Sequence, residues 1–319
     1  MKSFCISHSK DVDGIGSAAL VLAARGGGFK LTGYDEVIEE LGKVPAGVDS
    51  FVLCDVGVDQ SRLAQFVDKL GSLAKRCEVR YIDHHYLSAE SRRRLTKAGV
   101  NLVHDVEECA SMLTYQTFRK ELPEEAKKIA LYGAVTDYMD ASPLAKKMIE
   151  KEDRLFILLE ATILSNSVAE RGDDMEYLRM VAEELSKMKP PHEIDEVPRL
   201  AVEQLRRTVS MAREVKRGGK KMRMLAYMRT DEHATGSIAK LLIGAFDVPV
   251  GVAFREKSEP GWYEVSFRGT SECKVHLGRV VGRLAERHGG SGGGHRLAAG
   301  CRIPRHKIVT LLKELNHRL

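Results

Sequence analysis

The sequence has no continuous apolar run of about 18 residues, the length that a membrane-spanning helix needs. It also lacks an apolar N-terminal core of the secretory type, because charged residues occur within its first ten positions. Its six cysteines include no C-x-x-C pair, and Cys5 and Cys54 lie inside apolar runs. This disfavours a zinc-ribbon site or a disulfide framework. We therefore expect a cytoplasmic protein with reduced, buried thiols and no membrane partner.

Aromatic residues are scarce as well, at 6% of the 319 residues, whereas hydrophobic residues make up 43% and charged residues 30%. That balance can bury a sizeable core and excludes general disorder, and the length indicates about two domains. The formal net charge is only +5, which permits a phosphate-bearing partner without requiring one. Basic residues outnumber acidic ones most strongly over 199–230 and 268–319, which supports a polyanionic substrate.

Short apolar runs alternate with amphipathic helical patterns in the first half of the chain. Residues 4–7, 51–54 and 79–82 are predicted strands, and helical patterns separate them. This spacing predicts an α/β fold with a parallel sheet that carries helices on both faces. Residues 109–188 are predicted to be mostly helical.

The stretch 189–198 contains three prolines in ten residues and is the predicted linker. It separates a first domain, residues 1–188, from a second region, residues 199–319. We expect that region to begin with a basic helix and to continue as a smaller α/β domain.

Side chains suited to binding a metal follow each of the three predicted strands. In chain order they are His8, Asp11 and Asp13, then Asp55, and then Asp83, His84 and His85. Ligands of a parallel sheet bind beyond the carboxyl ends of its strands, so these three segments are expected to converge. Taken singly, Asp55 or the Asp11–Asp13–Gly14 turn is more typical of a simple turn or helix cap. Three such motifs at strand ends favour a metal site.

Carboxylate and imidazole groups together suit Mn²⁺, Fe²⁺, Zn²⁺ or Mg²⁺, and a carboxylate-rich set favours Mn²⁺ or Mg²⁺. The groups outnumber what one ion needs. Two ions about 3.5–4 Å apart would use them all and would promote in-line displacement at phosphorus.

A second signal lies near the C-terminus, where residues 289–294 contain five glycines and precede His295. Such a segment is either a phosphate cradle or a flexible surface loop, and glycine content alone favours the loop. Arg268, at the end of another predicted strand, offers a guanidinium fork for a phosphate.

Together these motifs resemble the DHH phosphoesterase superfamily, whose name matches Asp83-His84-His85 here. The glycine-rich segment 292–300 resembles the signature of the DHH-associated C-terminal domain. That branch includes RecJ-like exonucleases, nanoRNase/pAp-phosphatases and cyclic-di-AMP phosphodiesterases. The resemblance covers nearly the whole chain.

The resemblance implies a role for each matching residue. The implied metal ligands are His8, Asp11, Asp13, Asp55, His84 and Asp137. His85 would face the scissile phosphate, with Asp83 orienting it. The implied substrate-binding residues are Arg268, Gly292, Gly293, Gly294 and His295. Asp137 is assigned only through this resemblance.

The implied activity is a two-metal phosphoesterase that uses Mn²⁺, with Mg²⁺ or Co²⁺ as substitutes. Its expected substrates are short RNA or DNA oligonucleotides, dinucleotides and pAp, from which it releases mononucleotides, and a homodimer is compatible with the sequence. The enzymatic alternatives are a RecJ-like single-strand exonuclease, a cyclic-dinucleotide phosphodiesterase, or a pyrophosphatase or exopolyphosphatase. A replication-complex assembly module is the non-enzymatic alternative, which the retained ligand set disfavours.

Overall fold

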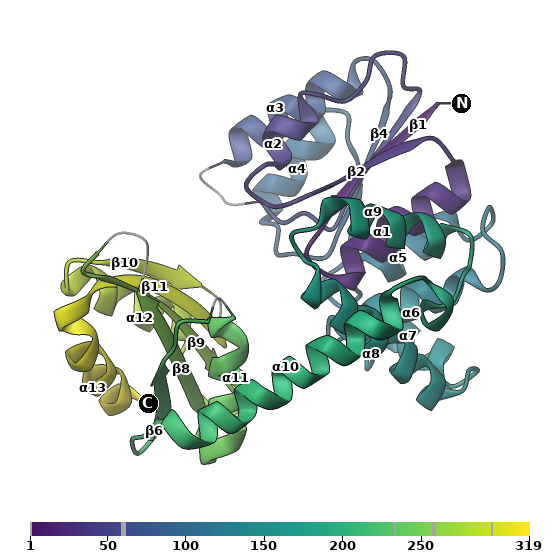
Figure 1. The fold of residues 1–319 in the computed structure, drawn as a ribbon. Coiled ribbons are helices and arrows are strands. Elements are labelled where there is room, and N and C mark those ends of the chain that lie inside the picture. The colour runs from purple at the N-terminus through teal and green to yellow at the C-terminus, as the bar shows by residue number, and fades with distance from the viewer. Residues whose placement is uncertain (1, 59–61, 233, 257–259, 295) are drawn as a thin grey trace. The chain divides into compact units, whose positions relative to one another are not determined.

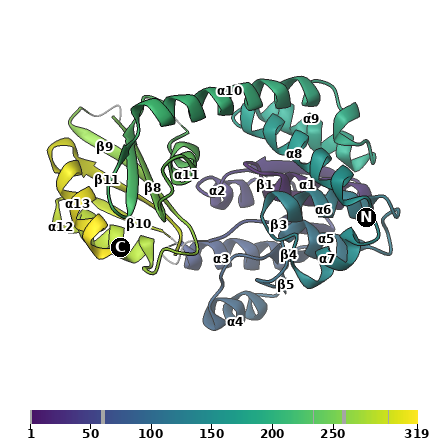
Figure 2. The same ribbon diagram turned by 90° about the horizontal axis from the view of Figure 1, so that it is seen from below.

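The computed structural model describes residues 2–58, 62–232, 234–256, 260–294 and 296–319 (Figures 1 and 2). The chain divides into two compact units, Met1–Leu205 and Arg206–Leu319. Each unit has its own sheet and its own hydrophobic cores. Within the described residues, no helix is both long enough and apolar enough to cross a membrane.

The first unit is built on a five-stranded sheet of order β2-β1-β3-β4-β5, in which all neighbours are parallel. Its strands are β1 (Ser3–His8), β2 (Gly28–Thr32), β3 (Ser50–Cys54), β4 (Glu78–Asp83) and β5 (Asn101–His104). The predicted strands correspond to β1, β3 and β4. The sequence pattern missed β2 and β5 because they are the edge strands, in which only Leu31 and Thr32 are buried.

Helices cover both faces of this sheet, as predicted (Figure 1). One layer contains α1 (Val12–Arg25), α5 (Ala110–Phe118), α6 (Ala126–Thr136), α7 (Pro143–Ile149), α8 (Arg154–Glu170) and α9 (Met175–Ser186). The opposite layer contains α2 (Val37–Leu41), α3 (Leu63–Ala74) and α4 (Ala89–Lys97). Successive residues of β3 point to opposite faces, so Val52 joins the first core while Phe51 and Leu53 join the second.

Residues 189–198, the predicted linker, pack against the first unit in the structure. This segment holds the short 3₁₀ helix η1 (Pro191–Glu193), and Ile194 and Val197 are buried in the core of the first unit. The prolines therefore shape a packed turn. The division between the units falls later, between Leu205 and Arg206, inside the long helix α10 (Val197–Gly218).

The second unit contains a six-stranded mixed sheet of order β10-β11-β9-β8-β7-β6, in which only the β7–β8 pair is parallel. The strands are β6 (Lys220–Lys221), β7 (Leu225–Arg229), β8 (Val250–Glu256), β9 (Trp262–Gly269), β10 (Ser291–Gly294) and β11 (Ala298–Pro304). The helices are α11 (Thr235–Phe246), α12 (Leu277–Arg287) and α13 (Ile308–Arg318), with η2 (Arg305–Lys307) before the last. Helix α11 covers one face, and α12 and α13 cover the other. This confirms the smaller α/β domain.

The glycine-rich segment forms the edge strand β10 rather than a loop. Helix α12 packs closely against this strand through its own Gly278, where a Cβ would collide with the carbonyl of Gly294. A Cβ on Gly293, by contrast, would meet no atom within 4 Å. His295 lies outside the described residues.

Candidate metal centre

The centre lies at the carboxyl edge of the first sheet, where three adjacent strands end in register. Ser7, Cys54 and Ile82 form one row across β1, β3 and β4. The next residue of each strand is therefore His8, Asp55 or Asp83, which places these three side chains at one edge. Strand register thus explains why segments far apart in sequence converge.

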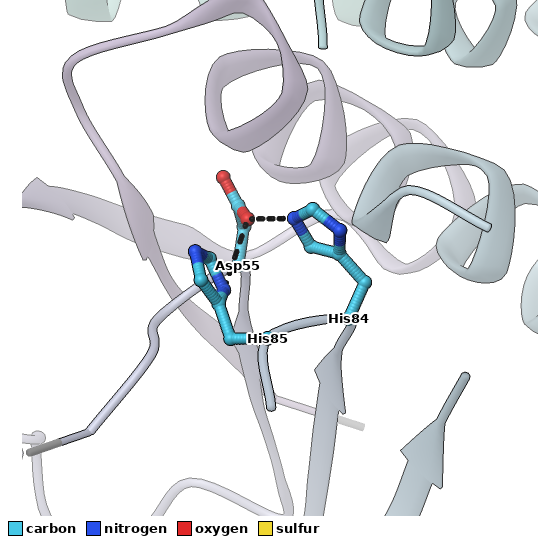
Figure 3. Close-up of side chains that lie close together, drawn as sticks. All are labelled: Asp55, His84 and His85. Atoms are coloured by element: carbon cyan, nitrogen blue, oxygen red, sulfur yellow. Dashed lines mark ion pairs between the residues drawn. The ribbon is translucent and has the colours of Figure 1, made fainter. Parts of the chain in front are cut away.

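His84 occupies the middle of this cluster. Its Nε2 atom lies 3.4 Å from Oδ1 of Asp55, 3.6 Å from Oδ2 of Asp137 and 3.8 Å from Oδ2 of Asp13. Figure 3 shows the Asp55 carboxyl group between the imidazoles of His84 and His85. Two groups of residues could each hold a metal ion, because the potential ligand atoms inside each group lie within 4.8 Å of one another. One group is Asp55, His84 and His85, and the other is Asp13, His84 and Asp137.

Asp55 is held under strain and in low-dielectric surroundings. Its φ angle is +55°, in the left-handed region that non-glycine residues seldom adopt. The side chain is buried, and its Oδ2 atom has no hydrogen-bonding partner among the described residues. Burial, followed by repulsion from the Asp11 and Asp13 carboxylates, raises the pKa of Asp55 well above its ordinary value.

Asp13 is fixed by the N-terminus of α5. Its Oδ2 accepts a hydrogen bond from the backbone N–H of Ala110 at 2.8 Å, and its Oδ1 accepts one from Ser111 at 2.9 Å. Nothing in the sequence pattern singled out residues 109–111. The contact shows that helix α5 orients the carboxylate, with its positive end turned towards the negative charge.

Asp137 follows the last residue of α6 and comes from the layer of helices rather than from a strand end. Burial raises its pKa to about 7, with the Asp13 and Asp11 carboxylates as the next causes. The structure therefore brings the residue that only the resemblance supplied to within 3.6 Å of His84.

Asp11 has a different position in the cluster. Its Oδ1 caps α1 by accepting a hydrogen bond from the Gly14 N–H at 2.9 Å, and its Oδ2 lies 3.6 Å from Nε2 of His8. The helix-cap interpretation is thus correct for one oxygen of Asp11, while the other faces the cluster. Burial lowers the pKa of His8, so this imidazole favours its neutral, metal-ligating form.

His85 is oriented by hydrogen bonds at both ring nitrogens. Its Nδ1 lies 2.9 Å from Oδ1 of the buried Asp83, and its Nε2 lies 3.2 Å from the hydroxyl of Tyr34. Tyr34 also stacks on His8, with ring centroids 4.1 Å apart, and no sequence pattern points to it. Burial alone would lower the pKa of His85, but the hydrogen bond to Asp83 outweighs it and the pKa is raised. A Cβ on Gly57 would lie 2.9 Å from Cγ of His85, so glycine is needed there.

The donor set fits divalent cations. Among the described residues, no lysine or arginine forms an ion pair with Asp13, Asp55 or Asp137, so their negative charge is uncompensated by the protein. The unpartnered Oδ2 of Asp55 has the character of an open ligand position. Imidazole and carboxylate groups in this ratio suit Mn²⁺ or Mg²⁺.

A further aspartate near these motifs stays outside the cluster. Asp140 forms an ion pair with Arg154 at 3.7 Å. Asp59 lies outside the described residues.

In the second unit, Arg268 is half-buried on β9, and burial lowers its pKa. Its Nη1 donates a hydrogen bond to the Phe267 carbonyl at 3.0 Å. A Cβ on Gly236, in the first turn of α11, would lie 2.7 Å from its Nη2. Because two adjacent elements confine the guanidinium, it is held in place without a carboxylate partner among the described residues.

Family models match both parts of the chain. The N-terminal domain of the DHH family matches residues 3–140, and the DHHA1 domain matches residues 218–319. The chain belongs to the DHH family. It is thereby a metal-dependent phosphoesterase. No curated protein sequence matches it.

Solved structures share the DHH fold at low sequence identity. The pGpG-specific phosphodiesterase PggH from Vibrio cholerae is 14% identical with a TM-score of 0.64, and the match covers 100% of this chain and 98% of that one. RecJ from Thermus thermophilus in complex with Mn²⁺ is 18% identical with a TM-score of 0.64. That match covers 99% of this chain but only 52% of RecJ. Another exonuclease RecJ bound to manganese is 16% identical, with a TM-score of 0.64 and coverage of 99% and 90%.

Replacing Gly133 with alanine is expected to destabilise the first unit of this DHH-family protein. The new Cβ would lie 2.6 Å from Oδ1 of Asp13 and would collide with the Ser111 hydroxyl. Overpacking of this kind costs about 1–3 kcal/mol, so the melting temperature should fall by roughly 5 °C. Gly244→Ala in α11 is the matched control, because its Cβ would meet no atom within 4 Å. Calorimetry that finds both variants equally stable would contradict this packing argument.

Proposed function

We propose that this DHH-family protein is a two-metal, Mn²⁺-dependent phosphoesterase that hydrolyses short oligonucleotides or dinucleotides to mononucleotides. One observation carries the proposal: Nε2 of His84 lies within 3.8 Å of carboxylates from three separate segments. His84 belongs to both sets of potential ligands, and the carboxylates that surround it outnumber the donors that one ion needs, which supports two neighbouring ions rather than one.

The proposed ligands all come from the first unit. They are His8, Asp11, Asp13, Asp55, His84 and Asp137. Two divalent ions in such a site lower the pKa of a water molecule and neutralise charge that develops on phosphoryl oxygens. Mn²⁺ is favoured by the mixed carboxylate and imidazole donors, with Mg²⁺ or Co²⁺ as substitutes. The RecJ structures with Mn²⁺ support the same choice.

His85 is the proposed contact to the scissile phosphate. Asp83 accepts a hydrogen bond from its Nδ1 and thereby fixes the ring plane and the position of Nε2. The raised pKa favours the protonated ring, in which Nε2–H can donate to a phosphate oxygen. Asp83 then acts by orienting His85 and stabilising its positive charge.

In the second unit, the proposed substrate-binding residues are Arg268, Gly292, Gly293, Gly294 and His295. Arg268 is confined by packing, and its guanidinium suits a phosphate. The open space beside Gly293 leaves the β10 backbone accessible to a ligand.

All six cysteines are free, which supports a reducing, cytoplasmic location.

Substrate length is the property that separates this proposal from a RecJ-like exonuclease. The match covers 98% of the pGpG-specific phosphodiesterase chain, which supports short substrates. With Mn²⁺, we expect pAp, a linear dinucleotide or a five-mer RNA to be cleaved at least about ten-fold faster than a long single strand. A protein that grips long strands needs a larger binding site, about 4–16 nucleotides for each OB fold.

The test is one panel of initial rates that also includes cyclic-di-AMP. Faster cleavage of the long strand would favour the exonuclease, and fastest cleavage of the cyclic substrate would favour the cyclic-dinucleotide phosphodiesterase. No turnover of any substrate with Mn²⁺ bound would favour the assembly role.

A further inference from the structure

Two tyrosines directly follow residues of the metal centre and are unusually exposed. Tyr86 follows His85, Tyr138 follows Asp137, and each side chain is 80% exposed. No other large hydrophobic side chain among the described residues is exposed to this extent. Because the rings are so exposed, burial of apolar area does not explain them.

Tyr138 also occupies a backbone position that disfavours it. It is the first residue beyond the C-cap of α6, its φ is +60°, and its N–H donates to the Val135 carbonyl at 3.3 Å. The following N–H, of Met139, donates to Ala134 at 2.8 Å, which completes the Schellman pattern of helix termination. Glycine is the usual residue there, because a Cβ makes the left-handed conformation unfavourable. The tyrosine therefore costs stability at this position.

The main chain holds both residues beside the proposed ligands. Asp137, whose Oδ2 lies 3.6 Å from Nε2 of His84, is one residue from Tyr138. The peptide that leads into Tyr86 is fixed by His104 on β5, whose Nε2–H donates to the His85 carbonyl at 2.7 Å. A nucleotide whose phosphate lies at the metal centre would have its sugar and base within reach of these rings.

We propose that Tyr138 and Tyr86 are stacking platforms for the bases that flank the scissile phosphate. The inference rests on the proposed function and names its substrate class: phosphodiesters that carry nucleobases, rather than pyrophosphate or polyphosphate. Every nucleobase offers a π-face to an aromatic ring, so such platforms bind substrates with little sequence preference. This accounts for exposed rings in an aromatic-poor chain and for a tyrosine where glycine would be more stable.

The experiment compares Tyr138→Gly with wild type on pApA and on analogues in which one adenine at a time is replaced by hydrogen. With Mn²⁺, we expect the variant to raise the KM for pApA about ten-fold with little change in kcat, because stacking binds substrate and transition state alike. On the analogue that lacks the stacked base, the variant and wild type should have equal KM. The melting temperature of Tyr138→Gly should rise by about 2–4 °C, because glycine relieves the backbone.

Two kinds of control, phenylalanine variants and a remote glycine variant, separate the effect of the ring from the effect of the backbone. Tyr138→Phe keeps the ring and should keep the wild-type KM, as should Tyr86→Phe, whereas Tyr86→Ala should raise it. Glu196 has a comparable φ of +65° and is exposed. Glu196→Gly should therefore raise the melting temperature without changing the KM.

An unchanged KM for pApA in both Tyr138→Gly and Tyr86→Ala would overturn the proposal. So would an equal loss on base-bearing and base-free substrates, because the rings would then act on the protein itself. Failure of the proposed function is distinguishable: wild type would turn over none of the substrates. Calorimetric binding of pApA and its analogues with Mn²⁺ then provides the same comparison, and stacking requires that Tyr138→Gly weaken only base-bearing ligands.

Discussion

Replacing His84 with alanine is expected to reduce Mn²⁺-dependent turnover of a short oligonucleotide at least about 1,000-fold, or about 4 kcal/mol of transition-state stabilisation. Its Nε2 atom lies 3.4–3.8 Å from carboxyl oxygens of Asp55, Asp137 and Asp13. His84 is the residue that the two groups of potential metal ligands share, so removing its imidazole weakens both groups. Alanine supplies no replacement ligand. Five of the six proposed ligands then remain, too few to hold two ions as the wild-type protein does.

The measurement is the initial rate of dinucleotide cleavage across a Mn²⁺ titration, with calorimetry to verify that the variant is folded. His306→Ala is the matched control, because His306 is an exposed histidine of η2 in the second unit. It should stay within about two-fold of wild type, as surface substitutions change little. A folded His84→Ala protein with more than a tenth of wild-type activity at the same Mn²⁺ concentration would refute the assignment.

The strand-end residues were predictable because a parallel sheet imposes their convergence. Once residues 4–7, 51–54 and 79–82 are strands of one sheet, the groups that follow them share its carboxyl edge. Local pattern suffices for those strands since they are buried on both faces and read as continuous apolar runs. The edge strands β2 and β5 lack that signature.

The partners that orient the site were not predictable from local pattern. Tyr34 reaches His8 and His85 from the loop after an edge strand that the pattern missed. Asp13 is held by Ala110 and Ser111, about a hundred residues away in sequence. Contacts of this kind depend on how helices pack on the sheet, and periodicity carries no information about them. The one local sign of this packing is Gly133, a glycine inside a helix. The absence of a Cβ at this position makes room for the carboxylate of Asp13.

Substituting Asp55 with asparagine is expected to act on stability and on activity in opposite directions. The wild-type carboxyl group is buried, and burial and the neighbouring carboxylates disfavour its ionised form. Asparagine removes the charge, keeps nearly the same shape and tolerates the left-handed φ of +55°. Without metal, the variant should melt about 3–8 °C above wild type at pH 8. With Mn²⁺, it should lose at least about 100-fold in turnover, because an anionic ligand is gone.

The difference in stability between Asp55→Asn and wild type is expected to depend on pH. An acid whose pKa is raised on folding contributes stability below its ordinary pKa of 3.8 and loses it as the pH rises through the raised value. The asparagine side chain does not titrate, so the melting-temperature advantage of Asp55→Asn in chelator should grow from pH 4 towards pH 8. Mn²⁺ should reverse the order, because the ion binds the ionised carboxylate of wild type and stabilises the folded state by mass action. Thermal unfolding of both proteins with EDTA and with Mn²⁺ measures these differences. A variant that is less stable than wild type at every pH in EDTA would show that the buried carboxylate of Asp55 does not destabilise the metal-free protein.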